Sequence, residues 1–336
     1  LYYIYNERPE NVITLAPCQC SKLKVMNSVL DLIGNTNLLK LNKITEPGMA
    51  GIYAKTEFTN PSGSIKDRMV KHVIEQAEER GDLKPGDLIV EASSGNTGVS
   101  LSMIASIKGY PACIVAPDTT SAVKAGMMTR YGAELVFTPN ELGVAAVVAK
   151  ANEVVESRGA YLLNQFATPD NVKAQNITGQ EILDQLSQVD AFCAGIGTGG
   201  TLAGIAQVLK EANPDCKIYA VEPEPVPAFY NMYYDKDLPI PEGIPHKIEG
   251  IGESFVPQIV EDHMDLIDGV ILCSDFDAMT TMATLTCEEG LCVGVSSGAN
   301  VWSAKQIAAK LGEDKNVVTI LPDTGQRYLD DIYWSC

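Results

Sequence analysis

Apolar and polar residues alternate along the chain with two different periods, and glycines separate the segments. From Ser28 onward, short apolar runs rich in β-branched residues indicate strands, while segments with apolar positions three or four residues apart indicate helices. The regular alternation of the two predicts a doubly wound α/β fold. The expected strands are 51–58, 88–90, 112–116, 134–137, 191–194, 218–221, 270–273 and 317–321, and the expected helices are one that opens at Ser64, one that is closed by Gly109, and 121–131, 141–158, 201–212, 277–289 and 297–311.

Two stretches lie outside this alternation. Residues 1–26 have neither period and are expected to form an N-terminal extension. Residues 223–257 are rich in proline and interrupt the second half of the pattern, which predicts a functional loop at the entrance of a pocket. The length of 336 residues is sufficient for two lobes with large buried cores.

Charge and cysteine content narrow the class of protein. A formal net charge of −18 argues against nucleic acid and anionic membranes as partners, because both would be repelled. No apolar run is long enough to span a bilayer. The nine cysteines form no disulfide framework, which indicates a reducing, cytoplasmic location with mostly buried thiols. Cys18 and Cys20 are interpreted as an incidental pair rather than a metal site, since the first histidine is His72.

The segment Asn60–Arg68 joins a predicted strand to a predicted helix and carries Lys66 in the first helical turn. Ser64 and Asp67 have the spacing of a capping box, which predicts that the helix starts at Ser64. The positive end of the helix dipole disfavours an ammonium group, so we expect Lys66 to have access to its neutral amine, the form that attacks a carbonyl. The segment alone leaves a solvated surface lysine open as the alternative.

A glycine-rich turn, Gly195–Thr201, follows a predicted strand and opens a predicted helix. Small residues there let backbone N–H groups approach a phosphate, so the turn predicts a phosphate site. The same turn also matches the glycine fingerprint of nicotinamide cofactor sites, and Glu222 lies at the end of the next strand, where such a site needs an acidic residue. A tight turn without a ligand is the third interpretation.

A polar turn, Glu91–Gly98, also lies between a strand and a helix. Its hydroxyl, amide and backbone donors suit a carboxylate ligand. Serine, threonine and asparagine are equally common in turns that only cap a helix, so the turn alone leaves both interpretations open. Val293–Ala299 is a third polar turn of this type, and by itself it indicates little.

Together these four stretches resemble one family, the tryptophan-synthase-type (fold type II) pyridoxal phosphate enzymes, nearest to cysteine synthase (O-acetylserine sulfhydrylase) and cystathionine β-synthase. The resemblance extends from Ser28 to Leu329 and includes the segments His246–Gly252 and Leu321–Tyr328. It implies two three-layer α/β/α lobes with pyridoxal 5'-phosphate in the cleft between them. The larger lobe would comprise 27–65 and 168–336, and the smaller lobe 66–167.

The resemblance also implies roles for individual residues. Lys66 would be the Schiff-base lysine, and Asn96 would hydrogen-bond the phenolic oxygen of the cofactor. Ser296 would face the pyridine nitrogen; a neutral hydroxyl does not hold that nitrogen protonated, which favours loss of a β-leaving group over transamination. The implied phosphate cradle is Gly197, Thr198, Gly199, Gly200 and Thr201, and the implied substrate-carboxylate set is Ser93, Ser94, Thr97 and Gln165.

Departures from the family pattern concern the substrates. Ser93 stands where the family usually has threonine, and Gln326 replaces a common glutamate for which we have no physical account. Glu249 stands where cysteine synthases commonly have glutamine and where cystathionine β-synthases have this glutamate. Glu249 and Glu253 are expected to repel an O-phosphoserine donor. The ending Arg327–Tyr333 resembles diaminopropionate synthases.

The resemblance implies replacement of the acetate of O-acetylserine by sulfide, giving L-cysteine, as the first choice of activity. Cystathionine synthesis from homocysteine is the first alternative, a diaminopropionate-synthase-like reaction is a more distant one, and a nicotinamide-dependent dehydrogenase is the rival from another class. A non-catalytic binding protein is disfavoured by the intact Lys66. The resemblance further implies a homodimer and serine acetyltransferase as a protein partner, with no metal.

Overall fold

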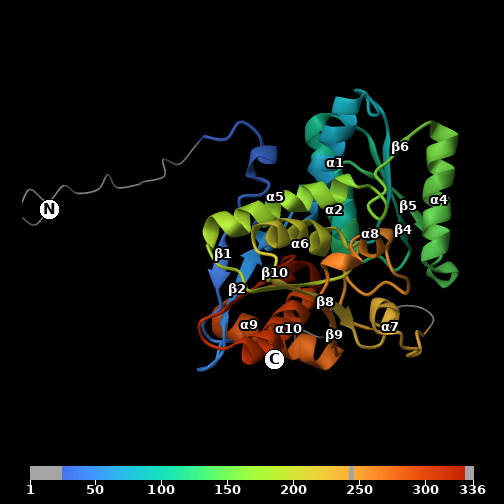
Figure 1. The fold of residues 1–336 in the computed structure, drawn as a ribbon. Helices are drawn as coiled ribbons and strands as arrows, with labels where there is room; N and C mark the ends of the chain where they lie inside the picture. Colours follow the sequence, from blue (N-terminus) through green and yellow to red (C-terminus); the bar gives the residue numbers. More distant parts are fainter. Residues whose placement is uncertain (1–24, 242–245, 330–336) are drawn as a thin grey trace, which may run out of the picture.

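The strands form two separate sheets in a computed structural model that describes residues 25–241 and 246–329. The six-stranded sheet has the order β1-β2-β10-β7-β8-β9, and the four-stranded sheet has the order β5-β4-β3-β6. Figure 1 shows β1, β2, β8 and β9 in one part of the molecule and β4, β5 and β6 in another. All pairs are parallel except β1 with β2. The strands are β1 (Leu38–Lys40), β2 (Gly51–Thr56), β3 (Ile89–Ala92), β4 (Ala112–Pro117), β5 (Glu134–Thr138), β6 (Tyr161–Leu162), β7 (Ala191–Gly195), β8 (Lys217–Pro223), β9 (Gly269–Cys273) and β10 (Asn316–Leu321).

Helices connect the parallel strands, as right-handed crossovers require. The α-helices are α1 (Lys66–Arg80), α2 (Asn96–Lys108), α3 (Ala122–Arg130), α4 (Gly143–Arg158), α5 (Asp170–Gln185), α6 (Gly200–Ala212), α7 (Ala228–Tyr234), α8 (Gln258–Asp262), α9 (Asp275–Glu289) and α10 (Val295–Leu311). Short 3₁₀ helices are η1 (Val29–Leu32), η2 (Glu57–Thr59), η3 (Asn140–Leu142), η4 (Met264–Leu266) and η5 (Gly325–Tyr328).

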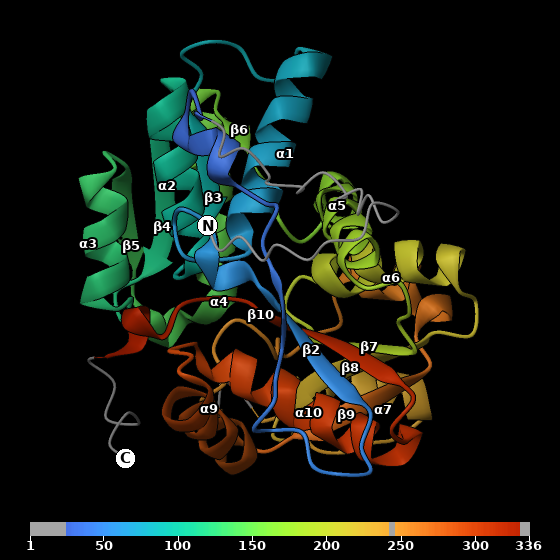
Figure 2. The same cartoon turned by 90° about the vertical axis from the view of Figure 1, so that its left-hand side faces the viewer.

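Both faces of the six-stranded sheet are buried, because its side chains alternate between two cores. In β7, Ala191 and Cys193 pack into the core that includes α9 and α10, while Phe192 and Ala194 pack into the core that includes α6. Figure 2 shows α9 and α10 on one side of the sheet and α5 and α6 on the other. The result is a three-layer α/β/α arrangement.

The four-stranded sheet is built in the same way. Ile89 and Ile114 face the core with α1 and α2, whereas Val90 and Val115 face the core with α4. The two three-layer arrangements confirm the predicted doubly wound α/β class. The lobe boundaries at residues 66 and 168 stay a prediction, which the division of the strands into two sheets supports.

Several elements were not predicted, and α5 is the largest. Its buried side includes polar and small residues such as Asn171, Gln175 and Thr178 instead of an apolar stripe, so its period is hidden in the sequence. The short strands β1 and β6 were also missed. The stretch 223–257 was expected to be a loop, but it contains α7.

The predicted burial of the cysteines holds for most of those described. Cys113, Cys193, Cys216 and Cys273 are buried, whereas Cys292 is partly exposed and Cys287 is exposed. Among residues 25–241 and 246–329, no helix is long and apolar enough to cross a membrane. Cys18 and Cys20, and nearly all of the predicted extension 1–26, lie outside the described residues.

Candidate active site

Lys66 is the first residue of α1, at the point where the chain passes from the six-stranded sheet to the four-stranded sheet. The predicted capping box is wrong in its second half. Ser64 Oγ accepts from the Lys66 backbone N–H at 3.3 Å, but the N-cap of α1 is Ile65, and among the described residues Asp67 does not bond back to Ser64. The Asp67 carboxylate instead accepts hydrogen bonds from the Ser62 backbone N–H at 2.7 Å and from Ser100 Oγ at 2.6 Å. Asp67 is buried and points into the protein, so it stabilises the turn before Lys66 rather than the helix end.

The environment of Lys66 favours its neutral amine. Burial lowers the pKa of Lys66, and the negative charges of Asp323 and Glu253 oppose this shift. Within the described part of the chain, no carboxylate lies within ion-pair distance of the Lys66 amine. The main cause is therefore desolvation, not the helix dipole on which the sequence argument relied.

The glycine-rich turn Gly197–Thr201 leads into the N-terminus of α6. A β-carbon at Gly197 would lie 2.4 Å from the Gly250 carbonyl oxygen. One at Gly200 would lie 2.1 Å from Asn171 Oδ1. Glycine is thus required by the close approach of neighbouring groups. No acceptor among the described residues faces the backbone N–H groups at 197–199, which leaves them available to an anion at the positive end of the helix.

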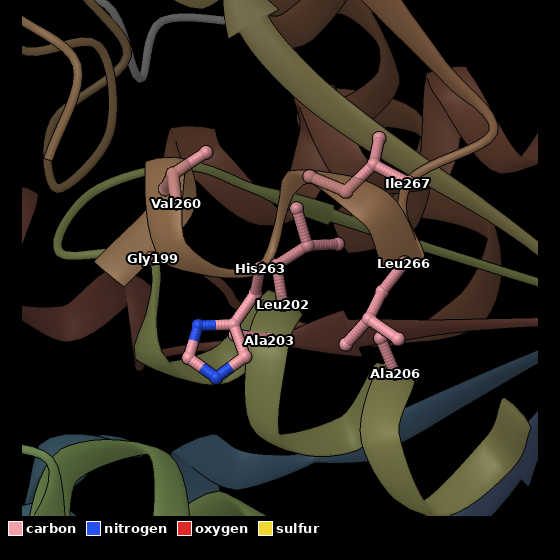
Figure 3. A pocket seen from close by; sticks show the side chains of 8 residues that line it. All are labelled: Gly199, Leu202, Ala203, Ala206, Val260, His263, Leu266 and Ile267. Carbon is pink, nitrogen blue, oxygen red and sulfur yellow. The ribbon is translucent and has the colours of Figure 1, made fainter. Parts of the chain in front are cut away.

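A small apolar pocket lies next to this turn, where α8 and the segment after it pack against α6 (Figure 3). Gly199 adopts φ +87°, and a β-carbon there would lie 2.4 Å from Val260 Cγ2. The His263 ring closes the pocket, and its Nδ1 lies 2.8 Å from the Ile259 carbonyl oxygen. The lining residues are Gly199, Leu202, Ala203, Ala206, Val260, His263, Leu266 and Ile267. The side chains that line this pocket therefore hold the glycine-rich turn in place by packing against Gly199.

Two asparagines that the sequence analysis did not single out connect the turns of the site. Asn171 Nδ2 donates to the Gln165 carbonyl oxygen at 2.9 Å and to Thr198 Oγ1 at 2.9 Å. Asn300 Oδ1 accepts from the Gly195 backbone N–H at 2.8 Å. Their roles depend on contacts between segments far apart in the chain, so spacing along the sequence carries no signal for them.

Asn96 begins α2 and is hydrogen-bonded to residues that follow β10. Its Nδ2 donates to Asp323 Oδ2 at 2.7 Å, and its Oδ1 accepts from Arg327 Nη1. The hydroxyl of Tyr328 also donates to Asp323 Oδ2. Asp323, Arg327 and Tyr328 are all at least 95% buried, so this network is shielded from solvent; their exposed fractions are 1%, 3% and 5%.

The predicted carboxylate set lies on one turn and on the segment opposite. Thr97 Oγ1 donates to Gln165 Oε1 at 2.7 Å, and Gln165 Nε2 donates to Glu91 Oε1 at 3.1 Å. Ser93 Oγ accepts from backbone N–H groups of its own turn at 3.1 and 3.2 Å, and Ser94 is exposed. Burial raises the pKa of Glu91 to about 7, and the hydrogen bonds that Glu91 accepts oppose the rise.

Glu249 forms an ion pair with Lys124 of α3, which joins the loop after α7 to the four-stranded lobe. The Lys124 side chain is buried, and its Nζ lies 4.6 Å from the centre of the Tyr328 ring, a cation–π contact. Burial raises the pKa of Glu253, and Lys66 lowers it. The sequence argument treated Glu249 as an uncompensated charge, and the structure shows that Lys124 neutralises it.

Ser296 lies in the first turn of α10 and is 4% exposed. The turn before it packs against the end of β10, since the Gly294 N–H donates to the Asp323 carbonyl oxygen at 3.1 Å. The structure thus brings the starts of α1, α2, α6 and α10 together around Asn96, Asp323 and the glycine-rich turn. Among the described residues, no group of three or more histidine, cysteine, aspartate or glutamate side chains forms a metal site.

The nicotinamide interpretation fails on the environment of Glu222. This residue is 3% exposed, and its carboxylate accepts from the backbone N–H groups of Phe229 at 2.9 Å and Tyr230 at 2.7 Å. Glu222 therefore anchors the start of α7 and has no oxygen directed to a ribose.

Comparison with known proteins agrees with this geometry. Residues 29–323 match the family described as pyridoxal-phosphate dependent enzyme. The chain belongs to this family. It is 39% identical over 315 residues to the cysteine synthase of Staphylococcus aureus, with 93% of this chain and 98% of the relative covered. The predicted pyridoxal phosphate cofactor is confirmed, and the dehydrogenase alternative is wrong.

Solved structures of two further proteins resemble the enzyme over nearly its whole length. O-Ureido-L-serine synthase superimposes with a TM-score of 0.86 at 36% identity, covering 93% of this chain and 96% of that one. The O-acetylserine dependent cystathionine β-synthase from Helicobacter pylori gives a TM-score of 0.85 at 34% identity, covering 93% and 100%. These likenesses confirm the predicted fold type II architecture of the cysteine synthase and cystathionine β-synthase group.

Proposed function

We propose that the enzyme replaces the acetate of O-acetylserine with sulfide and releases L-cysteine. The Staphylococcus aureus relative is a cysteine synthase, and the Helicobacter pylori protein is described as O-acetylserine dependent. The observation that carries the proposal is the position of Lys66, a desolvated lysine between the two sheets whose pKa is lowered by burial.

The residues around Lys66 fit pyridoxal phosphate. The backbone N–H groups at 197–199 before α6 would hold the phosphate, together with the rest of the turn to Thr201, and close neighbours exclude side chains at its glycines. The amide of Asn96 would donate to the phenolic oxygen, and Ser296 would face the ring nitrogen. When bound, the cofactor supplies an electron sink that acidifies the Cα–H of the amino acid and allows a β-leaving group to depart.

Lys66 is proposed to hold the cofactor covalently and then to act as the base at Cα. A base needs a pKa near the working pH, and burial lowers the pKa of Lys66 toward that range. Asp323 and Glu253 limit the shift, because their negative charges favour the ammonium form. The lysine can therefore accept the Cα proton and release it again.

Ser93, Ser94, Thr97 and Gln165 remain the proposed carboxylate set. The exposed Ser94 hydroxyl and the backbone donors of the turn are the groups nearest to solvent. The Thr97 hydroxyl donates a hydrogen bond to Gln165 Oε1 at 2.7 Å. Gln165 Nε2 in turn donates to Glu91, which determines the orientation of the Gln165 amide. Rotation of the Thr97 hydroxyl toward a bound carboxylate would exchange one acceptor for a charged one.

Sulfide is proposed as the nucleophile in preference to homocysteine. The sequence favours homocysteine only through Glu249, whose carboxylate would pair with the ammonium group of homocysteine. In the structure Glu249 is already paired with the buried Lys124, so its charge is compensated. A small nucleophile needs no such partner. Faster turnover with homocysteine than with sulfide at equal concentrations would make the enzyme a cystathionine β-synthase.

Borohydride reduction of the cofactor-loaded enzyme tests the proposal directly. The reduced cofactor should be found on the peptide that contains Lys66, and Lys66→Ala should lower turnover of O-acetylserine and sulfide by about 10²- to 10⁴-fold. Lys71→Ala is the matched control on the same helix, since the amine of Lys71 donates to the Leu30 carbonyl oxygen away from the site. Attachment to any other lysine would refute the assignment.

The assembly of the enzyme is part of the proposal. Family resemblance suggests a homodimer and serine acetyltransferase as a partner, and the reduced cysteines suggest a cytoplasmic location. Light scattering of the purified enzyme, alone and with that acetyltransferase, would measure both associations.

A further inference from the structure

The side chain of Asn96 is held at both ends by residues that no role has been assigned to so far. Arg327 Nη1 donates to its amide oxygen, and Asp323 Oδ2 accepts from its amide nitrogen at 2.7 Å. Arginine has only donors, and an ionised carboxylate has only acceptors. The two contacts therefore specify the same orientation of the amide.

We propose that Asp323 and Arg327 are positioning residues that lock the Asn96 amide with its NH₂ group directed at the cofactor. The amide nitrogen carries two hydrogens, and Asp323 takes one of them. The second hydrogen is left for the phenolic oxygen. A flipped Asn96 amide would instead direct its own oxygen at the phenolic oxygen of the cofactor, and these two hydrogen-bond acceptors would repel each other. The inference rests on the proposed role of Asn96.

The lock is rigid because its parts are buried and bonded elsewhere. Arg327 is 3% exposed, and its Nη2 donates to the carbonyl oxygen of Ser62, in the turn before Lys66. Asp323 is 1% exposed and also accepts from the Tyr328 hydroxyl. The guanidinium keeps its charge at every relevant pH, so the amide orientation does not depend on the protonation of Asp323.

The lock also spans the two sheets. Asn96 starts α2 on the four-stranded sheet, whereas Asp323 and Arg327 follow β10 of the six-stranded sheet. Arg327 thus aligns Asn96 and the Lys66 turn with one guanidinium, whose planar fork suits two acceptors better than an ammonium group does.

A double-mutant cycle tests the lock on the cofactor-loaded enzyme. Arg327→Met should raise the rate of cofactor dissociation about tenfold and change the ratio of the cofactor absorption bands, because loss of a charged hydrogen bond releases the amide. In an Asn96→Ala background the same change should have less than about a twofold effect. Arg327→Lys should restore part of the wild-type spectrum. Equal effects of Arg327→Met in both backgrounds would refute the lock and leave Arg327 a purely structural residue.

An isosteric variant keeps the test decisive if Arg327→Met does not fold. Asn96→Asp retains an acceptor for Arg327 but has no hydrogen to donate to Asp323 or to the cofactor. It should match Asn96→Ala in cofactor spectrum and dissociation rate, and wild-type behaviour of Asn96→Asp would overturn the proposal. A wild-type enzyme that attaches no cofactor to Lys66 would instead refute the proposed function, so the two failures are distinguishable.

Discussion

At the scale of single residues, desolvation controls the chemistry of the site. Lys66 and Asp323 are deprived of water by the same burial, which lowers the pKa of the lysine and raises the pKa of the aspartate. The negative charge of Asp323 limits the shift of Lys66, and the hydrogen bonds from Tyr328 and Asn96 limit the shift of Asp323. The site thus favours the neutral amine of Lys66 more than water would.

Ser296→Asp tests the residue proposed to face the ring nitrogen. An aspartate would hold that nitrogen protonated and strengthen the electron sink. The share of substrate that undergoes β-replacement should therefore fall, and the share that undergoes transamination should rise. The ratio of cysteine to 3-acetoxypyruvate, which forms together with the pyridoxamine form of the cofactor, reports the partition when it is measured with O-acetylserine and sulfide. Ser303→Asp, on a later turn of the same helix, should unfold or inactivate without changing that ratio. An unchanged ratio in Ser296→Asp would show that Ser296 does not face the ring nitrogen.

The pair of Lys124 and Glu249 determines the charge that a donor meets near the site. Glu249→Gln leaves the buried Lys124 unpaired, so an O-phosphoserine donor should improve several-fold relative to O-acetylserine, since one charge at a partly wet site is worth about 1 kcal/mol. Lys124→Met should shift the same ratio of kcat/KM values in the opposite direction. Parallel shifts in both variants would show that charge is not the cause.

At the scale of elements, the glycine-rich turn works because neighbouring segments leave no space for a side chain. Gly200→Ala should destabilise the enzyme by about 1–3 kcal/mol and increase cofactor loss, because the new β-carbon would lie 2.1 Å from Asn171 Oδ1. Thermal unfolding and cofactor dissociation measure the two effects.

Gly126→Ala in α3 is the control for this prediction. Nothing lies within 4 Å of a β-carbon there, so the substitution should stabilise the helix by about 0.5–1 kcal/mol. Destabilisation by both alanines to the same extent would mean that the glycines matter for backbone freedom and not for close packing.

Elements with a clear hydrophobic period were predictable, and so were turns with a distinctive composition. Strands such as β4 and β10 stand out in the sequence because apolar residues dominate them, and the turn Gly195–Thr201 stands out because of its glycines. Helix α5 was missed, since it buries polar residues in place of an apolar stripe: Asn171 donates to Gln165 and Thr198 in other segments, and Thr178 donates to Gln175 within the helix. The capping box was wrong for a related reason: Asp67 is satisfied by Ser62 and Ser100, and the latter is 33 residues away.

At the scale of the whole molecule, a buried ion network joins the two sheets. Arg68 of α1 donates to Glu57 and to Glu181 of α5, each at 2.7 Å, and Lys55 of β2 pairs with Glu181 at 2.7 Å. Burial raises the pKa of Glu181, but the hydrogen bonds from Arg68 outweigh this effect, and the pKa falls to about 2. The folded enzyme therefore favours the ionised form.

The network predicts the acid limit of stability. The contribution of Glu181 is complete above its ordinary pKa of 4.5 and is lost as the pH falls toward about 2. Arg68→Met should cost about 3–5 kcal/mol at pH 7, because it leaves the buried Glu57 carboxylate without its ion-pair partner and Glu181 with Lys55 alone. Urea unfolding at pH 7 and pH 3 measures both effects, and the difference between wild type and variant should shrink at pH 3.

Arg158→Met is the matched control for the network. Its ion pair with Glu134 is exposed, with side-chain exposures of 43% and 47%, so its loss should change the free energy of unfolding far less than the loss of Arg68 does. Equal costs for Arg68→Met and Arg158→Met would mean that burial does not strengthen the network.

The position of β10 has a consequence for the synthesis of the enzyme on the ribosome. This strand pairs with β2 on one side and β7 on the other, so the middle of the six-stranded sheet is filled by residues 316–321, which follow all the other strands in the sequence. Asp323 and Arg327 follow it directly. The sheet between β2 and β7 is therefore joined only after residues 316–321 have been synthesised, and the candidate cofactor site is completed only after residues 323–327 have followed.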